Sequence, residues 1–383
     1  MKKALIVSAL AGFTVTFLQH DIKLLQEMGY EVHCAGSLGH RTHAEYAETF
    51  GDLGAAFHQI DFASKSPFSR QTLIAMKQLR RLIKEQRFDV IHCHTPIPGV
   101  VVRATMAGQK IFAPKKTKII YTTHGFYFHK TSDRKSWLLY YPIEKLMSLF
   151  GDAIITINEE DFANAKRMWS KRAYHINGVG FDCEKYKSTV IDRNAYRESL
   201  GIDKNDFVVL STGELSDRKN HQIIIKAIAK LGRTDICYVI CGKAVQGQGT
   251  YDQLTQLARA TGVKLMLLGH RPDIPEICHC ADIGAFPSTR EGLGLSGLEM
   301  LASGLPVVSS NVHGIMDYMA DGVNGYTISP YDVDGFASAI NRLLDKDLRN
   351  SMRQACVESA AKFDKSISHK QMQNIYSELL GDF

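Results

Sequence analysis

Short apolar runs alternate along the chain with longer segments whose hydrophobic residues recur at helical spacing. In the first half these runs are Ala4–Val7, Glu31–Ala35, Asp89–His92, Lys118–Thr122 and Ala153–Ile157. After a linker near residues 178–188 they are Phe207–Thr212, Cys237–Cys241, Lys264–Leu268, Ile283–Phe286 and Leu305–Ser309. Strands that alternate with helices form parallel sheets covered on both faces. The pattern therefore predicts an α/β protein with two such sheets.

Length and composition agree with two globular domains. A chain of 383 residues exceeds the size at which one core usually keeps growing. The content of 45% hydrophobic and 22% charged residues is ordinary for a globular enzyme. No stretch of 18 apolar residues occurs, so no membrane span is expected. The segment Met1–Ala11 imitates a secretory signal, but its apolar core is short, and we predict a first strand that enters a glycine-bearing loop.

The eight cysteines are scattered, several of them inside apolar runs such as Ile236–Cys241. This favours buried, reduced thiols of a cytosolic protein. Cys278-His-Cys280 lacks the second ligand pair of a zinc site. Metal ligands are therefore not expected there.

The segment from Pro287 to Gly304 carries the most specific chemistry. It reads Pro-Ser-Thr-Arg-Glu-Gly-Leu-Gly-Leu-Ser-Gly-Leu-Glu-Met-Leu-Ala-Ser-Gly, with Glu291 and Glu299 eight positions apart. Two glycines after Glu291 allow close backbone approach to a ligand, and a helix that starts there attracts phosphate. At the helical rise the carboxylates would lie about 10 Å apart, on either side of a diphosphate. The alternative is that Glu291 caps a core helix and Glu299 is a solvated side chain.

Together with the following Leu305-Pro-Val-Val308, this segment resembles the donor-site motif of retaining family-4 glycosyltransferases with the GT-B fold. The resemblance spans nearly the whole chain. It implies two Rossmann-like domains that face each other across a cleft, 1–185 for the acceptor and 186–365 for the nucleotide-sugar donor. It also implies that a last helix within 366–383 crosses back to the first domain. The runs Ser66-Pro-Phe-Ser69 and Tyr140-Tyr-Pro-Ile-Glu144 resemble bacterial enzymes of capsular or exopolysaccharide assembly.

The resemblance also assigns roles to individual positions. His124, in Thr-Thr-His-Gly after an apolar strand, matches a histidine that faces the transferred sugar, and Lys219 matches a lysine that pairs with the donor diphosphate. Many members carry arginine where this chain has Glu214, and we hypothesise that Arg218 supplies the missing charge. The implied catalytic residues are His124 and Glu291. The implied donor-binding residues are Gly12, Arg218, Lys219, Gly292, Leu293, Gly294, Leu295 and Glu299.

Two further patterns suggest metal chemistry but have simpler interpretations. Asp332-Val-Asp334 has the letters of a metal-binding Asp-x-Asp pair, yet it opens a predicted helix, where aspartate is a favoured cap. His92 and His94 share one face of a strand, and we interpret them as structural or as lining the acceptor site. No metal and no cofactor are therefore predicted.

Basic residues are concentrated in the first half. Residues 1–185 carry 25 Lys and Arg against 17 Asp and Glu, whereas residues 186–383 carry 21 against 23. The segment Ser69–Phe88 is predicted to be a basic amphipathic helix, which is typical of a solvated face or of a membrane-surface contact. With Lys115–Lys116, Lys130, Arg134–Lys135 and 166–172, it indicates attraction to an anionic membrane surface. No aromatic-studded motif accompanies the charge, so nucleic acid is not expected as a partner.

The sequence therefore predicts a metal-independent, retaining glycosyltransferase that moves a hexose or N-acetylhexosamine from a nucleotide sugar, favoured as a UDP-sugar. The acceptor is expected to be a glycan, lipid-linked through polyprenyl diphosphate or soluble, and the location cytoplasmic and peripheral at the inner face of the plasma membrane. Two alternatives remain: a UDP-sugar epimerase of similar fold, and a non-catalytic sugar-nucleotide-binding protein at the membrane.

Overall fold

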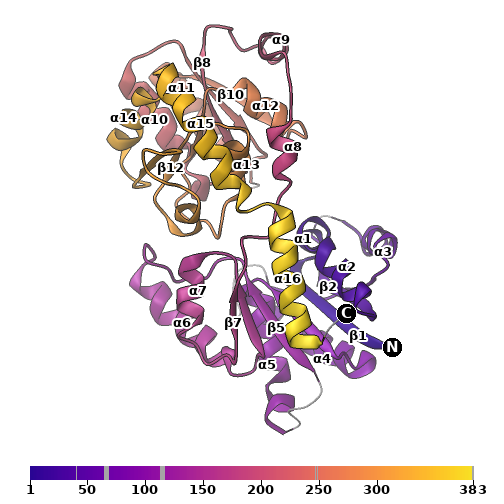
Figure 1. The fold of residues 1–383 in the computed structure, drawn as a ribbon. Helices are drawn as coiled ribbons and strands as arrows, with labels where there is room; N and C mark the ends of the chain where they lie inside the picture. Colours follow the sequence, from indigo (N-terminus) through magenta and orange to yellow (C-terminus); the bar gives the residue numbers. More distant parts are fainter. Residues whose placement is uncertain (40, 64–68, 113–116, 246, 248, 382–383) are drawn as a thin grey trace. The chain divides into compact units, whose positions relative to one another are not determined.

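The chain forms two compact units in a computed structural model that describes residues 1–39, 41–63, 69–112, 117–245, 247 and 249–381. Unit 1 comprises Met1–Val179 and Ser366–Phe383, and unit 2 comprises Gly180–Lys365 (Figure 1). The run from Ser66 to Phe68 and the pair Lys115–Lys116 lie outside the described residues.

Unit 1 is built on a seven-stranded parallel sheet with the strand order β3-β2-β1-β4-β5-β6-β7. Its strands are β1 (Lys2–Leu10), β2 (Tyr30–Ser37), β3 (Ala56–Gln59), β4 (Val90–His94), β5 (Lys118–Thr123), β6 (Ala153–Thr156) and β7 (Ala173–His175). Its helices are α1 (Ala11–Phe17), α2 (Gln19–Glu27), α3 (His43–Asp52), α4 (Arg70–Gln86), α5 (Pro96–Phe112), α6 (Arg134–Ser148), α7 (Glu159–Ala165) and α16 (Lys365–Leu380).

The strand order determines which helices cover which face of this sheet. From β1 the chain moves to one edge through β2 and β3, and it then returns to β4 and continues to the other edge. Right-handed crossovers therefore place α1 to α3 on one face and α4 to α6 on the other. Helices α4, α5 and α6 pack side by side.

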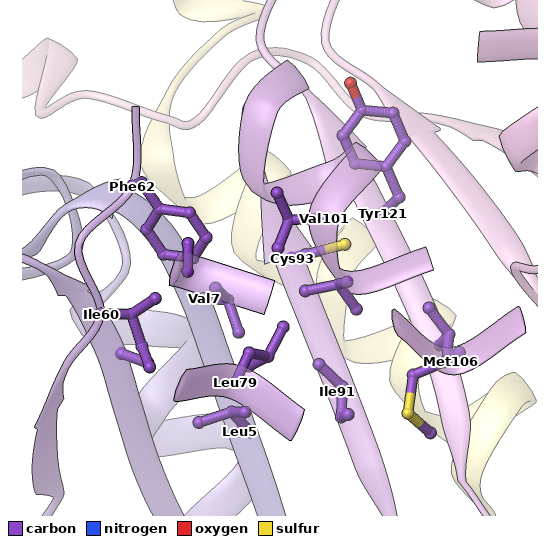
Figure 2. Packing of buried hydrophobic residues seen from close by; sticks show 14 of the residues in the cluster. Leu5, Val7, Ile60, Phe62, Leu79, Ile91, Cys93, Val101, Met106 and Tyr121 are labelled. Carbon is purple, nitrogen blue, oxygen red and sulfur yellow. The ribbon is translucent and has the colours of Figure 1, made fainter. Parts of the chain in front are cut away.

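The core beneath this second layer consists of apolar side chains from the strands and the helices. Figure 2 shows Leu5 and Ile91 of the strands beneath Leu79 of α4, with Val101 and Met106 from α5. All five side chains are almost fully buried. Burial of apolar side chains stabilises the fold by about 25 cal/mol per Å² of apolar surface. The packed core therefore holds the strands of unit 1, and with them the strand ends, in place.

Unit 2 contains a six-stranded parallel sheet in the order β10-β9-β8-β11-β12-β13. Its strands are β8 (Phe207–Thr212), β9 (Ile236–Cys241), β10 (Lys264–Gly269), β11 (Ile283–Phe286), β12 (Val307–Ser310) and β13 (Gly325–Ile328). Its α-helices are α8 (Cys183–Lys187), α9 (Arg193–Ser199), α10 (His221–Leu231), α11 (Thr250–Thr261), α12 (Ile274–Cys280), α13 (Leu295–Ala302), α14 (Val333–Arg342) and α15 (Lys346–Ala361). Two short 3-10 helices are η1 (Asp217–Lys219) and η2 (His313–Asp317).

Each of the ten predicted apolar runs overlaps a strand, which confirms two parallel α/β sheets. The strands that the pattern did not predict are β3, β7 and β13. All three are short edge strands that mix polar and apolar residues, so they lack the continuous apolar run of a strand buried between neighbours.

Other local expectations had mixed outcomes. The prediction of a glycine-bearing loop after β1 is wrong, because the strand runs directly into α1 and Gly12 is the second residue of that helix. The capping prediction for Asp332 is confirmed, since its carboxylate accepts the Gly335 N–H at 2.9 Å at the start of α14. All eight cysteines are buried and unpaired, as predicted. Within the described part of the chain, no helix has the length and apolar character to cross a bilayer.

Candidate active site

The predicted donor residues of unit 2 lie on two loops that follow neighbouring strands and in helix α13, which the second loop enters. Strand β8 ends at Thr212 and β11 at Phe286, and these two strands are adjacent where the strand order reverses. Ligands of parallel α/β sheets bind outside the carboxyl ends of the strands at such a switch point. The loops are joined by a Thr289 N–H to Arg218 C=O hydrogen bond at 2.9 Å and by the Asn220 side-chain amide, which donates to the Pro287 C=O at 3.2 Å.

A carboxylate and two cations meet between these loops. One oxygen of Glu291, Oε1, accepts from Lys219 Nζ at 2.8 Å and from Arg218 Nη1 at 2.6 Å. Arg218 also donates through Nη2 to Glu214 Oε1 at 3.1 Å. The structure therefore brings Arg218, Lys219 and Glu291 together, and it makes Glu214 the second carboxylate partner of Arg218.

Burial and charge act in opposite directions on Glu291. Desolvation would raise the pKa of this carboxyl, but the adjacent Lys219 and Arg218 charges outweigh it and hold the pKa below its usual value. Glu291 is therefore an ionised, hydrogen-bond-accepting group at neutral pH, with only 10% of its side chain exposed.

The position of Lys219 depends on close backbone packing. It ends the single turn η1, is buried, and lies with Nζ 4.8 Å from the centroid of the Phe286 ring. Gly213 has φ +131°, and a Cβ on it would lie 3.0 Å from Lys219 Cε. A side chain at Gly213 would thus be strained and would displace the ammonium group.

The second loop enters α13 through a glycine that has a positive φ. Gly294 is the N-cap residue, with φ +87°, so the helix starts without a side-chain cap. A Cβ on Gly294 would lie 2.5 Å from the Phe286 ring, and one on Gly314 of η2 would lie 2.0 Å from the Gly292 carbonyl oxygen. Leu293 between them is buried. These contacts hold the loop close to β11 and η2, and they orient the start of α13.

Glu299 is the fifth residue of α13, about one turn after Leu295, rather than two continuous turns after Glu291. The predicted separation of about 10 Å between the two carboxylates assumed one continuous helix from Glu291 to Glu299. That assumption is wrong, because α13 begins at Leu295. Burial raises the pKa of Glu299, and a hydrogen bond from Tyr186 of α8 offsets part of that effect. Sequence reasoning missed Tyr186, because nothing in the pattern of the short helix α8 indicates that it packs on α13.

In unit 1, His124 follows β5 and lies beside the end of β4. Its Nε2 is 3.2 Å from His94 Nδ1, and its ring packs edge-on against Phe13 of α1 at 4.9 Å. Burial lowers the pKa of His124 to about 4, so the imidazole is neutral at physiological pH. A neutral imidazole has one donor and one acceptor nitrogen, so His94 and His124 share one proton between their facing nitrogens.

The neighbouring His92 belongs to a buried hydrogen-bond chain. Its Nδ1 lies 2.7 Å from the Tyr376 hydroxyl of α16, which also contacts Asp21 Oδ1 at 3.2 Å, and its Nε2 lies 2.8 Å from Thr122 Oγ1. The rings of His92 and His94 are 4.1 Å apart, as their shared strand face predicts. Among the described residues no group of three or more His, Cys, Asp or Glu side chains is arranged to hold a metal ion.

A hollow of about 370 Å³ in unit 1 is lined by apolar and polar residues, and the polar ones include His20, Asp21, His94, His124 and His369. Gly12 does not line it; a Cβ on Gly12 would lie 3.1 Å from the Tyr46 hydroxyl. Gly12 and His124 belong to unit 1, and the other predicted site residues belong to unit 2.

Comparison with known proteins agrees with this geometry. Residues 192–363 match the family described as glycosyl transferases group 1, and residues 4–158 match the family described as glycosyl transferase 4-like. The glycosyltransferase EpsD of Bacillus subtilis is 32% identical over 93% of this chain and 91% of its own length. The Escherichia coli UDP-Gal:alpha-D-GlcNAc-diphosphoundecaprenol alpha-1,3-galactosyltransferase is 28% identical over 73% of this chain and 72% of its own.

The fold is that of solved GT-B glycosyltransferases. HepE from Anabaena, solved in complex with UDP, superposes with a TM-score of 0.79 at 20% identity, over 98% of this chain and 100% of its own. Two parallel α/β units, a buried Lys–Glu pair at the switch point of the second, and the matches over both halves support one conclusion. The chain belongs to the group 1, family-4-like glycosyltransferases with the GT-B fold.

Proposed function

We propose that this glycosyltransferase moves a hexose or N-acetylhexosamine from a UDP-sugar to a polyprenyl-diphosphate-linked glycan, with retention at the anomeric carbon, in the assembly of a surface glycan. Unit 2 binds the donor and unit 1 the acceptor. The observation that carries the proposal is the buried contact of Lys219 and Arg218 with Glu291, beside the glycine-capped start of α13. The names of the E. coli and Anabaena relatives support a UDP-linked donor, and the E. coli enzyme supports a lipid-linked acceptor.

Each proposed role follows from the charge and hydrogen-bonding capacity of the residue. Lysine has three N–H donors and Lys219 gives one to Glu291, which leaves donors for the diphosphate. The N–H groups at the start of α13 add a favourable field for the same anion. Ionised Glu291 accepts hydrogen bonds from sugar hydroxyls, Glu299 binds the ribose, and neutral His124 donates a hydrogen bond to the sugar.

In the reaction, the bond between the anomeric carbon and the diphosphate oxygen breaks while a bond to the acceptor hydroxyl oxygen forms. The hydroxyl proton passes to the departing diphosphate oxygen, so that UDP leaves from the face that the acceptor enters. Preorganised donors at the diphosphate stabilise the charge that develops there. Charge neutralisation is thus assigned to Lys219, Arg218 and the helix start, and a divalent metal is not required.

The proposal is tested by calorimetric titration with UDP, GDP and a panel of their sugars in EDTA. We expect micromolar binding of UDP and of one UDP-sugar, and at least about tenfold weaker binding in Glu299→Ala, which corresponds to the loss of about 1.4 kcal/mol. Glu291→Ala should retain the fold by circular dichroism and lose transfer. Full transfer by Glu291→Ala, or strict dependence on Mg²⁺, would contradict the mechanism, and conversion of a UDP-sugar without an acceptor would favour an epimerase.

The contribution of Arg218 is separable from that of Lys219. Arg218 forms ion pairs with two carboxylates, and 35% of its side chain is exposed. Lys219 is buried and forms an ion pair with one carboxylate, that of Glu291. We expect Lys219→Ala to weaken UDP binding by about a hundredfold, and Arg218→Ala by about tenfold, because a partly exposed charge is screened. Unchanged affinity in Arg218→Ala with weakened affinity in Lys219→Ala would refute the idea that Arg218 replaces the missing arginine.

A peripheral location at the cytoplasmic face of the membrane is the remaining part of the proposal. The basic side chains of α4, among them Arg70, Lys77, Arg81 and Lys84, are exposed, whereas Leu79 and Leu82 are buried. An exposed basic helix is attracted to anionic headgroups, with an energy that falls as salt increases.

A further inference from the structure

Helix α6 exposes large apolar side chains that helices in contact with water usually turn inward. The exposed fractions are 79% for Leu138, 47% for Leu139, 48% for Leu146 and 50% for Leu149, the residue that follows the helix. Single exposed leucines are common, but three on one helix with a fourth at its end form a patch. Positions 138, 142, 146 and 149 recur at helical spacing, so this patch is one side of α6.

Packing on the opposite side prevents the helix from rotating these leucines inward. Trp137 and Tyr141 pack against the ring of buried Phe128, at 5.2 and 5.3 Å between centroids. Glu144 forms a buried ion pair with Arg103 of α5 at 2.7 Å. Turning α6 would break this pair and leave an uncompensated buried charge, which is strongly unfavourable. The leucine side is therefore held toward the exterior of unit 1.

Basic residues flank the leucines, and Asp133 is the exposed N-cap residue of the helix. Arg134 and Lys135 are exposed in the first turn of α6, where the helix dipole disfavours positive charge. Lys145 lies over the ring of Trp169 at 5.0 Å, and that tryptophan is itself 53% exposed. The one acidic residue of α6 is Glu144, which is buried and paired. Leucine, tryptophan and lysine on one surface are the composition of a helix that lies in the interface of an anionic bilayer.

We infer that this surface, formed by the exposed side of α6 and Trp169, seats unit 1 on an anionic lipid bilayer. The leucines and Trp169 enter the boundary between headgroups and acyl chains, and Arg134, Lys135 and Lys145 pair with lipid phosphates. The basic helix α4 adds long-range attraction, whereas α6 supplies the apolar contact that salt does not screen. The inference rests on the proposed membrane-linked acceptor, since it explains how the protein stays where such an acceptor is found.

The test is co-sedimentation of the full chain with vesicles of phosphatidylcholine alone and of phosphatidylcholine with 30% phosphatidylglycerol, at low and at high salt. We expect the wild type to bind the anionic vesicles and to retain part of this binding at high salt. The double variant Leu138→Gln/Leu146→Gln should bind at least tenfold more weakly at high salt. Both leucines are exposed, so the fold should persist, and circular dichroism checks this. Val323→Gln in unit 2, which replaces a residue that is 53% exposed, is the matched control and should bind like the wild type.

A second readout reports whether Trp169 enters the lipid. Its fluorescence should shift to shorter wavelength on anionic vesicles, and Trp169→Phe should abolish the shift while Trp137 remains. Equal vesicle binding by the wild type and the double leucine variant would overturn the inference. So would a wild-type dimer, measured by light scattering, that the leucine substitutions convert to a monomer, because the surface would then bind a second copy.

Donor binding by calorimetry is measured on the same proteins without vesicles. Loss of vesicle binding with normal UDP affinity would confine the failure to the bilayer contact. Absent UDP binding with intact vesicle binding would refute the proposed donor and leave the surface assignment in place.

Discussion

The chemistry of individual carboxylates in this protein is set by their neighbours. Glu291 and Asp21 are both buried, yet their pKa values move in opposite directions. Glu291 has two cations beside it, whereas hydrogen bonds, among them one from the Tyr376 hydroxyl, offset only part of the desolvation of Asp21. Burial therefore raises the pKa of Asp21 to about 7, while the ion pairs keep Glu291 ionised.

The raised pKa of Asp21 predicts a specific pH dependence of stability. The folded protein keeps the Asp21 proton up to pH about 7, whereas the unfolded chain releases it near the ordinary aspartate pKa of 3.8. The protonated, buried carboxyl of Asp21 therefore stabilises the fold fully at a pH below the pKa of the unfolded chain. This stabilisation is lost as the pH rises through about 7. The side chain of the Asp21→Asn variant cannot ionise, so the variant should not lose stability in this way. The loss in the wild type amounts to several kcal/mol in the free energy of unfolding, at about 1.4 kcal/mol per pKa unit.

The measurement is urea unfolding of the wild type and Asp21→Asn at pH 5 and pH 8. The variant should gain stability relative to the wild type as the pH rises. An identical pH dependence in the two proteins would mean that Asp21 titrates in the fold as it does in water.

At the scale of elements, the site of unit 2 is shaped by segments that touch no predicted ligand. The single turn η2 contacts the loop between β11 and α13, and Gly314 packs against the Gly292 carbonyl with no room for a methyl group. Phe286, the last residue of β11, supports both Gly294 and Lys219. The donor loop is therefore positioned by backbone packing as well as by its own sequence.

Gly314→Ala should weaken UDP binding by about tenfold or more without touching the ligand, because its Cβ would displace Gly292 and the start of α13. The control is Gly322→Ala, where φ is positive, at +75°, but nothing lies within 4 Å of the added Cβ. That variant should cost about 1 kcal/mol of stability through backbone strain and leave UDP affinity unchanged. Calorimetry and thermal unfolding of both variants check this; equal effects on UDP affinity would contradict the role of the contact between Gly314 and the Gly292 carbonyl.

At the scale of the whole molecule, the chain builds two units with separate sheets, and its last helix belongs to the first unit. Tyr376 fixes that helix, since its hydroxyl contacts His92 and Asp21 inside unit 1 and its ring is fully buried. Residues 284 positions apart in sequence thus stabilise one core.

Tyr376→Phe should therefore destabilise unit 1 alone. Two buried hydrogen bonds lose their shared hydroxyl, which typically costs about 1–3 kcal/mol. Hydrogen exchange should become faster in peptides from β4 and stay unchanged in peptides from β9, and UDP affinity should stay within about threefold of the wild type because the proposed donor site lies in unit 2. Equal acceleration in β4 and β9 would indicate that the two units unfold as one cooperative body.

The sequence by itself determined the two parallel sheets and most of their strands, because strands buried on both faces must be continuous apolar runs. It also indicated Lys219, Glu291 and Glu299 as donor-site candidates through local motifs, and their roles stay predictions. Edge strands such as β7 were missed, since partial exposure removes the apolar signal. The placement of Gly12 failed because one glycine does not distinguish a loop from the first turn of a helix.

Only the tertiary structure decided which distant groups meet and which side chains stay exposed. Arg218 and Glu291 are 73 positions apart, and Tyr186 reaches Glu299 from a helix with no sequence signal. Likewise, the periodicity of α6 does not say which side is buried, because aromatic residues occupy one side and leucines the other. Ion pairs and exposure depend on the packing of segments remote in sequence, and local pattern carries no information about that packing until the sheets are assembled.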